Sequence, residues 1–205
     1  TFVLDSSGSM SAIEDDTKGG FNTFLDDQKD EEGEATVSLY DFNTNVDQVY
    51  RGRAIEHAPE LTDETFSPGG RTALHDAIST AITETAAAIS GMSSESRPDN
   101  VIIVILTDGK ENASETPQKR VREQVEYRRE EFEWEFLFIG ANQDAALTAS
   151  EMGMQKDKSL NMSHNAEGTQ AAYESTSQRI SDARQQGRTG GFNQEDRDRQ
   201  DNAEG

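Results

Sequence analysis

The chain has no cysteine, and none of its apolar runs approaches the roughly 20 residues that a membrane-spanning helix needs. Without cysteine, neither a disulfide framework nor a thiolate metal site can form. Without a long apolar run, no segment is predicted to cross a membrane. Residues 1–4 have the character of an apolar strand and not of a signal peptide, so we expect the natural protein to extend further upstream.

Basic residues are also scarce, because 19 lysines and arginines face 40 acidic residues, which gives a formal net charge of −21. A role in DNA or RNA binding is disfavoured, since phosphate contacts need a basic face. Such an excess of negative charge destabilises a compact fold at low salt, and concentrated salt screens the repulsion. We therefore expect a halophilic source, as in halophilic archaea. The alternative is an unusually acidic protein from a mesophile.

Three short apolar runs predict buried strands, because they lack the alternation of a half-exposed strand. They cover residues 2–4, 101–106 and 136–139. Further patterns predict a hairpin over 35–42 and 46–50, a weak strand over 159–162, and helices over 11–30, 72–89, 117–130, 144–152 and 167–184. This order predicts an α/β fold: a doubly wound, mainly parallel central sheet with one antiparallel edge strand and helices on both faces.

The length fits one domain, which we place at residues 1–187. Apolar content falls from about residue 185 onward. We therefore predict that residues 188–205 form a disordered acidic tail.

Oxygen-bearing side chains stand where ligands bind in open α/β sheets, beyond the carboxyl ends of the strands. Asp5, Ser7 and Ser9 follow the first strand, Asp108 follows the 101–106 strand, and Thr72 follows a glycine-rich turn. Oxygen donors without sulfur or imidazole suit a hard cation, Mg²⁺ or Mn²⁺. The serine loop by itself has another interpretation, in which Ser7 or Ser9 caps the following helix and Asp5 hydrogen-bonds a turn.

Taken together, the Asp5-x-Ser7-x-Ser9 loop, Thr72 and the Thr107-Asp108-Gly109 segment resemble the metal-ion-dependent adhesion site (MIDAS) of von Willebrand factor A domains. The resemblance covers roughly residues 1 to 185. It implies that Ser7, Ser9 and, in one state, Thr72 ligate the metal directly, whereas Asp5 and Asp108 act largely through coordinated waters. It also implies a protein-binding module whose metal accepts a carboxylate from an unidentified partner. Similar domains without disulfides or signal segments favour a cytoplasmic location.

A metal-dependent hydrolase or phosphatase is the competing interpretation, because haloacid-dehalogenase-like phosphatases also begin with an aspartate at the end of the first strand. Those enzymes need a second acid two residues on, where this chain has Ser7. Of the residues near these motifs, only His75 has the chemistry of a general base. We therefore predict a binding module without enzymatic activity.

Several neighbours of the motifs have simpler interpretations. We expect His75 to pack or cap and Asp76 to make local hydrogen bonds. Glu111 and Asn112 are expected to be solvated loop residues. The segment 140–144 ends a strand on the same rim, where it either shapes partner selectivity or forms an ordinary turn.

Overall fold

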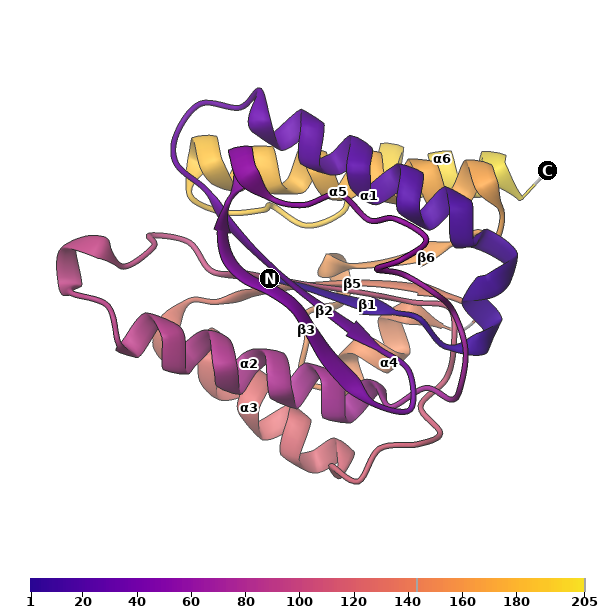
Figure 1. Ribbon diagram of the computed structural model, residues 1–205, viewed down its shortest axis with the longest axis horizontal. Coiled ribbons are helices and arrows are strands. Elements are labelled where there is room, and N and C mark those ends of the chain that lie inside the picture. Colours follow the sequence, from indigo (N-terminus) through magenta and orange to yellow (C-terminus); the bar gives the residue numbers. More distant parts are fainter. Residues whose placement is uncertain (143, 205) are drawn as a thin grey trace.

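The computed structural model describes residues 1–142 and 144–204, which build a six-stranded sheet with the order β3-β2-β1-β4-β5-β6 (Figure 1). The strands are β1 (Phe2–Asp5), β2 (Thr36–Phe42), β3 (Val46–Ala54), β4 (Ile102–Thr107), β5 (Glu135–Ala141) and β6 (Ser159–Met162). β2 and β3 pair antiparallel at one edge, and the other neighbouring strands pair parallel. The predicted doubly wound sheet with one antiparallel edge strand is confirmed.

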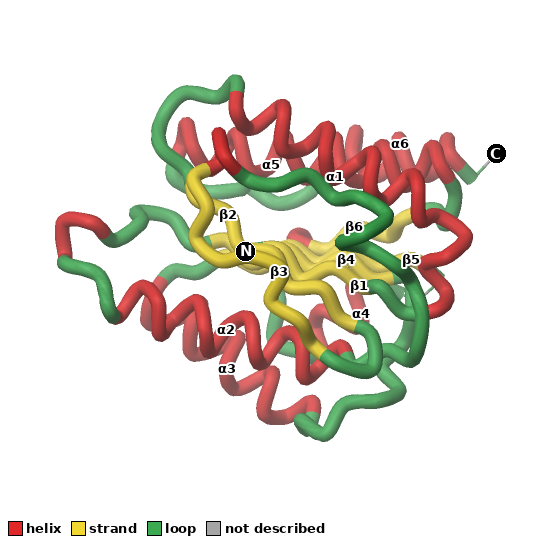
Figure 2. Tube along the Cα trace, in the orientation of Figure 1, coloured by secondary structure: helices red, strands yellow, loops and turns green. Residues whose placement is uncertain are grey.

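Helices cover both faces of the sheet, as Figure 2 shows in red against the yellow strands. They are α1 (Glu14–Lys29), α2 (Leu74–Ser90), α3 (Gln118–Phe132), α4 (Ala145–Glu151), α5 (Ala166–Gln186) and α6 (Gln194–Ala203). α1, α5 and α6 lie on one face, and α2, α3 and α4 lie on the other (Figure 1). None of these helices is long and apolar enough to cross a membrane, as far as the described residues show.

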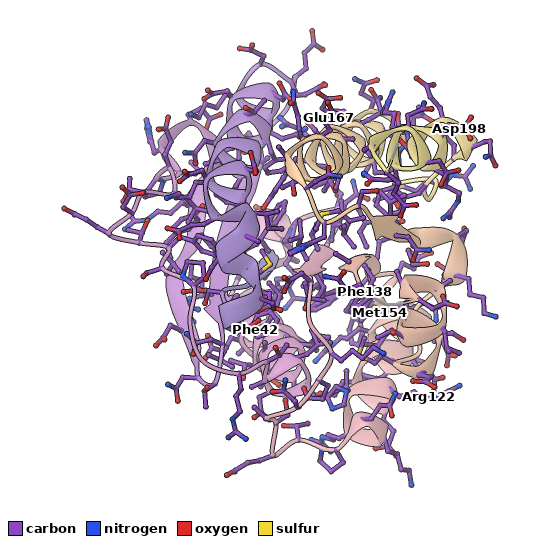
Figure 3. The ribbon with its side chains drawn as sticks, turned by 90° about the vertical axis from the view of Figure 1, so that its right-hand side faces the viewer. Phe42, Arg122, Phe138, Met154, Glu167 and Asp198 are labelled. Carbon is purple, nitrogen blue, oxygen red and sulfur yellow. The ribbon has the colours of Figure 1, made fainter. Side chains whose placement is uncertain are left out.

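The central strands β1, β4 and β5 are apolar except at their ends, because both of their faces are buried. In β1, Leu4 packs into the core under α1 and α5, whereas its neighbour Val3 packs into the core under α2. In β5, Phe138 faces the second of these cores, where Met154 also lies (Figure 3). The uninterrupted runs in the sequence therefore reflect a sheet sandwiched between two layers of helices.

Gly20 explains the glycine pair inside the first predicted helix, where we expected close packing or a kink. A Cβ at Gly20 would lie 2.3 Å from the Tyr173 ring of α5, whereas a Cβ at Gly19 would meet nothing within 4 Å. Close packing at Gly20 lets α1 and α5 lie side by side on the same face of the sheet.

Residues 194–203 differ from the disordered tail that we expected, because they form helix α6 beside α5 (Figure 3, Asp198 on α6 and Glu167 on α5). Asn193 and Asp196 form a capping box at its start. Phe192 is buried just before the helix, and Gln200 is buried within it. A helix that docks through polar contacts leaves little apolar signal in the sequence. Gly205 lies outside the described residues, and the domain boundary at residue 187 stays a prediction.

Candidate metal centre

Asp5 and Asp108 come together because β1 and β4 are adjacent parallel strands that end at the same edge of the sheet. Leu4 pairs with Leu106 in the β1–β4 register, so the next residues leave the sheet side by side. Both aspartates are buried, with exposed fractions of 0% for Asp5 and 2% for Asp108. The structure therefore unites the two strand ends that the sequence singled out.

A chain of hydrogen bonds links four of the predicted site residues. The backbone N–H of Ser7 donates to Oδ1 of Asp5 at 2.7 Å, and Oγ of Ser7 lies 3.2 Å from Oγ of Ser9. Oγ of Ser9 donates to Oδ1 of Asp108 at 2.6 Å. Ser7 precedes the 3-10 helix Gly8–Ile13, but its side chain makes no capping hydrogen bond there. The Ser9 hydroxyl thus faces the end of β4, and the capping interpretation of Ser7 is not supported. The other part of that interpretation is seen, because Asp5 accepts a hydrogen bond within the turn that follows it.

Thr72, the fifth predicted residue, lies on the loop before α2 and faces the same point. A Cβ added at Gly109 would lie 2.8 Å from Oγ1 of Thr72 and 3.6 Å from Oδ2 of Asp5. Asn112 fixes this loop: its Oδ1 accepts from the N–H of Thr72 and its own N–H donates to the Thr72 carbonyl, both at 3.0 Å. Asn112 is exposed, as expected for a solvated loop residue, and it also links two loops.

The glycine-rich turn is fastened to the serine loop through the backbone. The N–H of Gly69 donates to the carbonyl of Ser6 at 2.8 Å, and the N–H of Gly8 donates to the carbonyl of Gly70 at 3.2 Å. Gly70 has φ +78°, a conformation that other residues rarely adopt. These bonds hold the loops that carry Ser7, Ser9 and Thr72 in one arrangement.

The two buried carboxylates give the site its electrostatic character. Burial raises the pKa of Asp5 to about 6, against the opposing effect of hydrogen bonds from Thr107 and Ser7. Oδ2 of Asp108 is buried and has no hydrogen-bond partner within the part of the chain that the structure describes. Buried carboxylates are costly unless a cation pairs with them. This donor set fits a hard divalent cation.

Two basic residues lie among the loops of the site, where acidic residues such as Asp76 and Glu111 also lie. Arg71 precedes Thr72 and Lys110 follows Gly109, and both of these basic residues are exposed. Positive charge therefore stands beside the loops of the site, on a chain whose net charge is −21.

His75 and Asp76 lie beside the centre without joining its hydrogen-bonded chain. Asp76 accepts from the N–H groups of Glu115 and Thr116 at 3.0 and 2.8 Å, which confirms its local hydrogen-bonding role. Nδ1 of His75 lies 3.9 Å from Oε2 of Glu111.

Glu111 and the 140–144 segment, for which the sequence leaves open a turn or a role in partner selectivity, also contact the loops of the site. Glu111 accepts from the backbone N–H groups of His75, Ala113 and Ser114, so it organises this loop instead of being merely solvated. On the 140–144 rim, Nδ2 of Asn142 donates to the carbonyl of Asp108 at 3.5 Å, and Gln143 lies outside the described residues.

Two residues at the site were missed as contributors. Oγ1 of Thr107 donates to Oδ2 of Asp5, a role that the Thr107-Asp108-Gly109 motif does not predict. Nε2 of His164 lies 2.8 Å from Oδ2 of Asp108. His164 follows the weak strand β6, and its place after a parallel strand was the signal that could have found it.

The described residues contain no group of three or more histidine, cysteine, aspartate and glutamate side chains placed to hold a metal ion. A cation at this centre would depend on hydroxyl oxygens as well as on carboxylates.

Comparisons with known proteins agree with this architecture. The family model of the von Willebrand factor type A domain matches residues 1–188. No curated protein sequence matches the chain significantly.

Among solved structures, the chain is similar to proximal thread matrix protein 1 from the mussel byssus, solved with a zinc-occupied MIDAS motif (15% identity, 86% of this chain and 46% of that one, TM-score 0.60). It is also similar to the pilus adhesin SpaC from Lactobacillus rhamnosus GG (12% identity, 88% and 29% covered, TM-score 0.67). A third is a von Willebrand factor type A protein from Catenulispora acidiphila (15% identity, 86% and 41% covered, TM-score 0.58).

At these identities the likeness establishes the fold alone. The chain spans less than half the length of each of these three proteins.

Proposed function

The chain belongs to the von Willebrand factor type A domain family, and from this premise we propose that it is a protein-binding module completed by a divalent cation. Asp5, Ser7, Ser9, Thr72 and Asp108 would hold Mg²⁺ or Mn²⁺. The observation that carries the proposal is the hydrogen-bonded chain from Asp5 to Asp108, which joins two buried carboxylates through the backbone N–H of Ser7 and the hydroxyls of Ser7 and Ser9.

A bound cation would supply an electrophilic position that accepts a carboxylate oxygen from a partner. The hydroxyls of Ser7, Ser9 and Thr72 are neutral donors, so they leave the positive charge of the site incompletely cancelled. Ser9 is exposed, whereas Ser7 and Thr72 are buried. The centre is therefore open to solvent on the side of Ser9, which is where a partner can approach.

The charge distribution supports an acidic group as the part of the partner that docks. Arg71 and Lys110 are exposed beside the loops of the site, while the molecule as a whole repels anions. Binding of an acidic partner should therefore be favoured in concentrated salt, which screens the long-range repulsion more than a direct contact.

The cytoplasmic location that the sequence favours stays a prediction.

Metal-dependent hydrolysis is the second candidate, and one observation favours it. His164 lies beside Asp108 at the centre, and an imidazole is the commonest general base in enzymes. Against it, Ser7 stands where phosphatases of the haloacid-dehalogenase type need a second acid. We expect no turnover of p-nitrophenyl phosphate with Mg²⁺. Robust turnover that Asp5→Ala abolishes would make the protein an enzyme.

The binding proposal is tested by capture of partners from native lysate in high salt, with Mg²⁺ or with a chelator. The wild-type chain should retain a partner only with Mg²⁺, and Ser7→Ala should lose it. Ser11→Ala is the matched control, because Ser11 is exposed in the same 3-10 segment and lies outside the predicted ligand set. Capture that ignores both the chelator and Ser7→Ala would contradict the proposal.

A further inference from the structure

His164 reaches the metal centre because β6 is parallel to β5, so that the segment after β6 leaves the sheet at the same edge as the site. Its Nε2 lies 2.8 Å from Oδ2 of Asp108. The two groups form an ion pair when the imidazole is protonated, and apart from this contact both atoms are buried without a hydrogen-bond partner among the described residues. The Asp108 side chain is 0% exposed. When Nε2 carries no proton, two buried acceptor atoms thus lie side by side and neither satisfies the other.

A shared cation would satisfy both atoms. Neighbouring ligands of an octahedral ion, each about 2.0–2.1 Å from it, lie about 2.9 Å from each other. The separation of 2.8 Å between Nε2 and Oδ2 is close to that value. Oγ of Ser9 is 2.6 Å from the other oxygen of Asp108, so the hydroxyl, the carboxylate and the imidazole are neighbours.

We propose that His164 is a nitrogen ligand of the cation at this centre, which therefore prefers Mn²⁺ or Zn²⁺ to Mg²⁺. This inference rests on the proposed function, because it needs a cation at the site of Asp108. Imidazole nitrogen suits transition metals, whereas Mg²⁺ prefers oxygen ligands. A site built only from the predicted hydroxyls and carboxylates would show no preference for transition metals over Mg²⁺.

The segment around His164 is held on both sides by the C-terminal helix. The N–H of Ser163 donates to Oε1 of Gln200, and Oγ of Ser163 donates to the Gln200 carbonyl, both at 2.9 Å. Nδ2 of Asn165 donates to the carbonyl of Ala203 at 2.7 Å. These contacts fix the backbone on either side of His164. The backbone that carries the imidazole is therefore held in place before any ion arrives, which lowers the entropic cost of ligation.

Calorimetric titrations with Mg²⁺, Mn²⁺ and Zn²⁺ in high salt test the preference. Compared with the wild type, His164→Ala should weaken Mn²⁺ and Zn²⁺ binding by about tenfold or more and Mg²⁺ binding by less than about threefold. His57→Ala is the matched control, since His57 is exposed and follows the edge strand β3, and it should bind all three cations as the wild type does.

Pulsed electron paramagnetic resonance of the Mn²⁺-loaded chain tests ligation directly and does not depend on the stability of a variant. The wild type should show the ¹⁴N coupling of a bound imidazole. The chain has three histidines, so the coupling can be assigned: His57→Ala and His75→Ala should keep it, and His164→Ala should lose it.

A Mn²⁺-loaded wild type without imidazole coupling would overturn the assignment of His164 while leaving the proposed cation site intact. An unchanged ratio of Mn²⁺ to Mg²⁺ affinity in His164→Ala would do the same. A wild-type chain that binds none of the three cations would instead overturn the proposed function, and the inference with it.

Discussion

Gly109 is a residue at which the absence of a side chain keeps the metal centre open. A Cβ there would lie 2.8 Å from Oγ1 of Thr72 and 3.6 Å from Oδ2 of Asp5. The first distance is shorter than real Cβ contacts allow, so the hydroxyl of Thr72 would have to move. We expect Gly109→Ala to weaken Mn²⁺ binding by about tenfold in a calorimetric titration, within the range seen when groups that support a metal site are changed.

Gly19→Ala is the control for this substitution, because a Cβ at Gly19 would meet nothing within 4 Å. Gly19 is exposed inside α1, so alanine there should leave Mn²⁺ affinity unchanged and stabilise the fold by up to about 1 kcal/mol. Equal affinities of Gly109→Ala and the wild type would mean that Thr72 is not needed at the centre.

Asp41 of β2 connects the stability of the fold to pH. Burial raises the pKa of Asp41 to about 6, with a smaller opposing effect from its hydrogen bond with Ser6, and its Oδ1 has no hydrogen-bond partner among the described residues. The unfolded chain has the ordinary value near 4. Between these two pKa values the folded state binds more protons than the unfolded state. Asp41 therefore lowers the free energy of unfolding as the pH rises from about 4 to 6.

Asp41→Asn should remove this contribution. Chemical denaturation of the metal-free chain at constant salt should show the variant more stable than the wild type by on the order of 1–2 kcal/mol at pH 7. The difference should shrink toward pH 4. A difference that stays constant over this range would show that Asp41 is not the cause.

At the residue scale, the side chains that belong to motifs could be predicted from the sequence. His164 belongs to no motif and could not. Asp5, Ser7, Ser9 and Asp108 follow strand ends at fixed spacings, and the structure joins them in one hydrogen-bonded chain. That they bind a cation stays a proposal. His164 has no motif around it, and it reaches Asp108 only because the sheet brings the end of β6 to the same edge.

At the element scale, the accuracy of the prediction depended on how each element is buried. β4 and β5 are covered on both faces, so nearly every residue in them is apolar and the strands are evident in the sequence. α6 buries polar side chains instead, among them Asp196 and Gln200. Its stability comes from a capping box and from hydrogen bonds to distant segments, which hydrophobic periodicity cannot reveal.

Gln200 is the residue through which α6 holds the segment that carries His164. Its side chain accepts from the N–H of Ser163 at 2.9 Å and donates to the carbonyl of Gly168 at 3.0 Å. Gln200→Ala leaves both groups without that partner, which should lower the free energy of unfolding by about 1–3 kcal/mol. Mn²⁺ affinity should also fall a few-fold, because the segment loses its anchor.

Gln194→Ala is the matched control on the same helix. Gln194 is exposed, and its side chain bonds only Asp198 one turn away among the contacts described, at 2.7 Å. This variant should keep both the stability and the Mn²⁺ affinity of the wild type. If Gln200→Ala lowers stability but leaves the affinity unchanged, α6 supports the fold and not the metal centre.

At the scale of the whole molecule, the net charge of −21 governs the response to salt. At about 0.1 M salt the screening length is about 10 Å, and at about 1 M it is about 3 Å, so repulsion between surface carboxylates falls steeply over this range. We expect the thermal midpoint of unfolding to rise clearly between these concentrations of KCl.

Sucrose at matched osmolality is the control, because it excludes itself from the surface without screening charge. A midpoint that does not respond to KCl, or that sucrose raises equally, would contradict the electrostatic explanation. The halophilic source that we inferred from the composition would then lose its physical basis.

We propose above that the loop after β1 and the end of β4 hold one divalent cation. A calorimetric titration with Mn²⁺ tests it most directly, comparing the wild type with the double variant Ser7→Ala, Ser9→Ala and with the exposed control Ser11→Ala. We predict one Mn²⁺ per chain for the wild type and the control, and an affinity at least about 100-fold weaker for the double variant, because two direct ligands are lost. Equal affinity of all three proteins, or a wild type that binds no Mn²⁺, would contradict the claim.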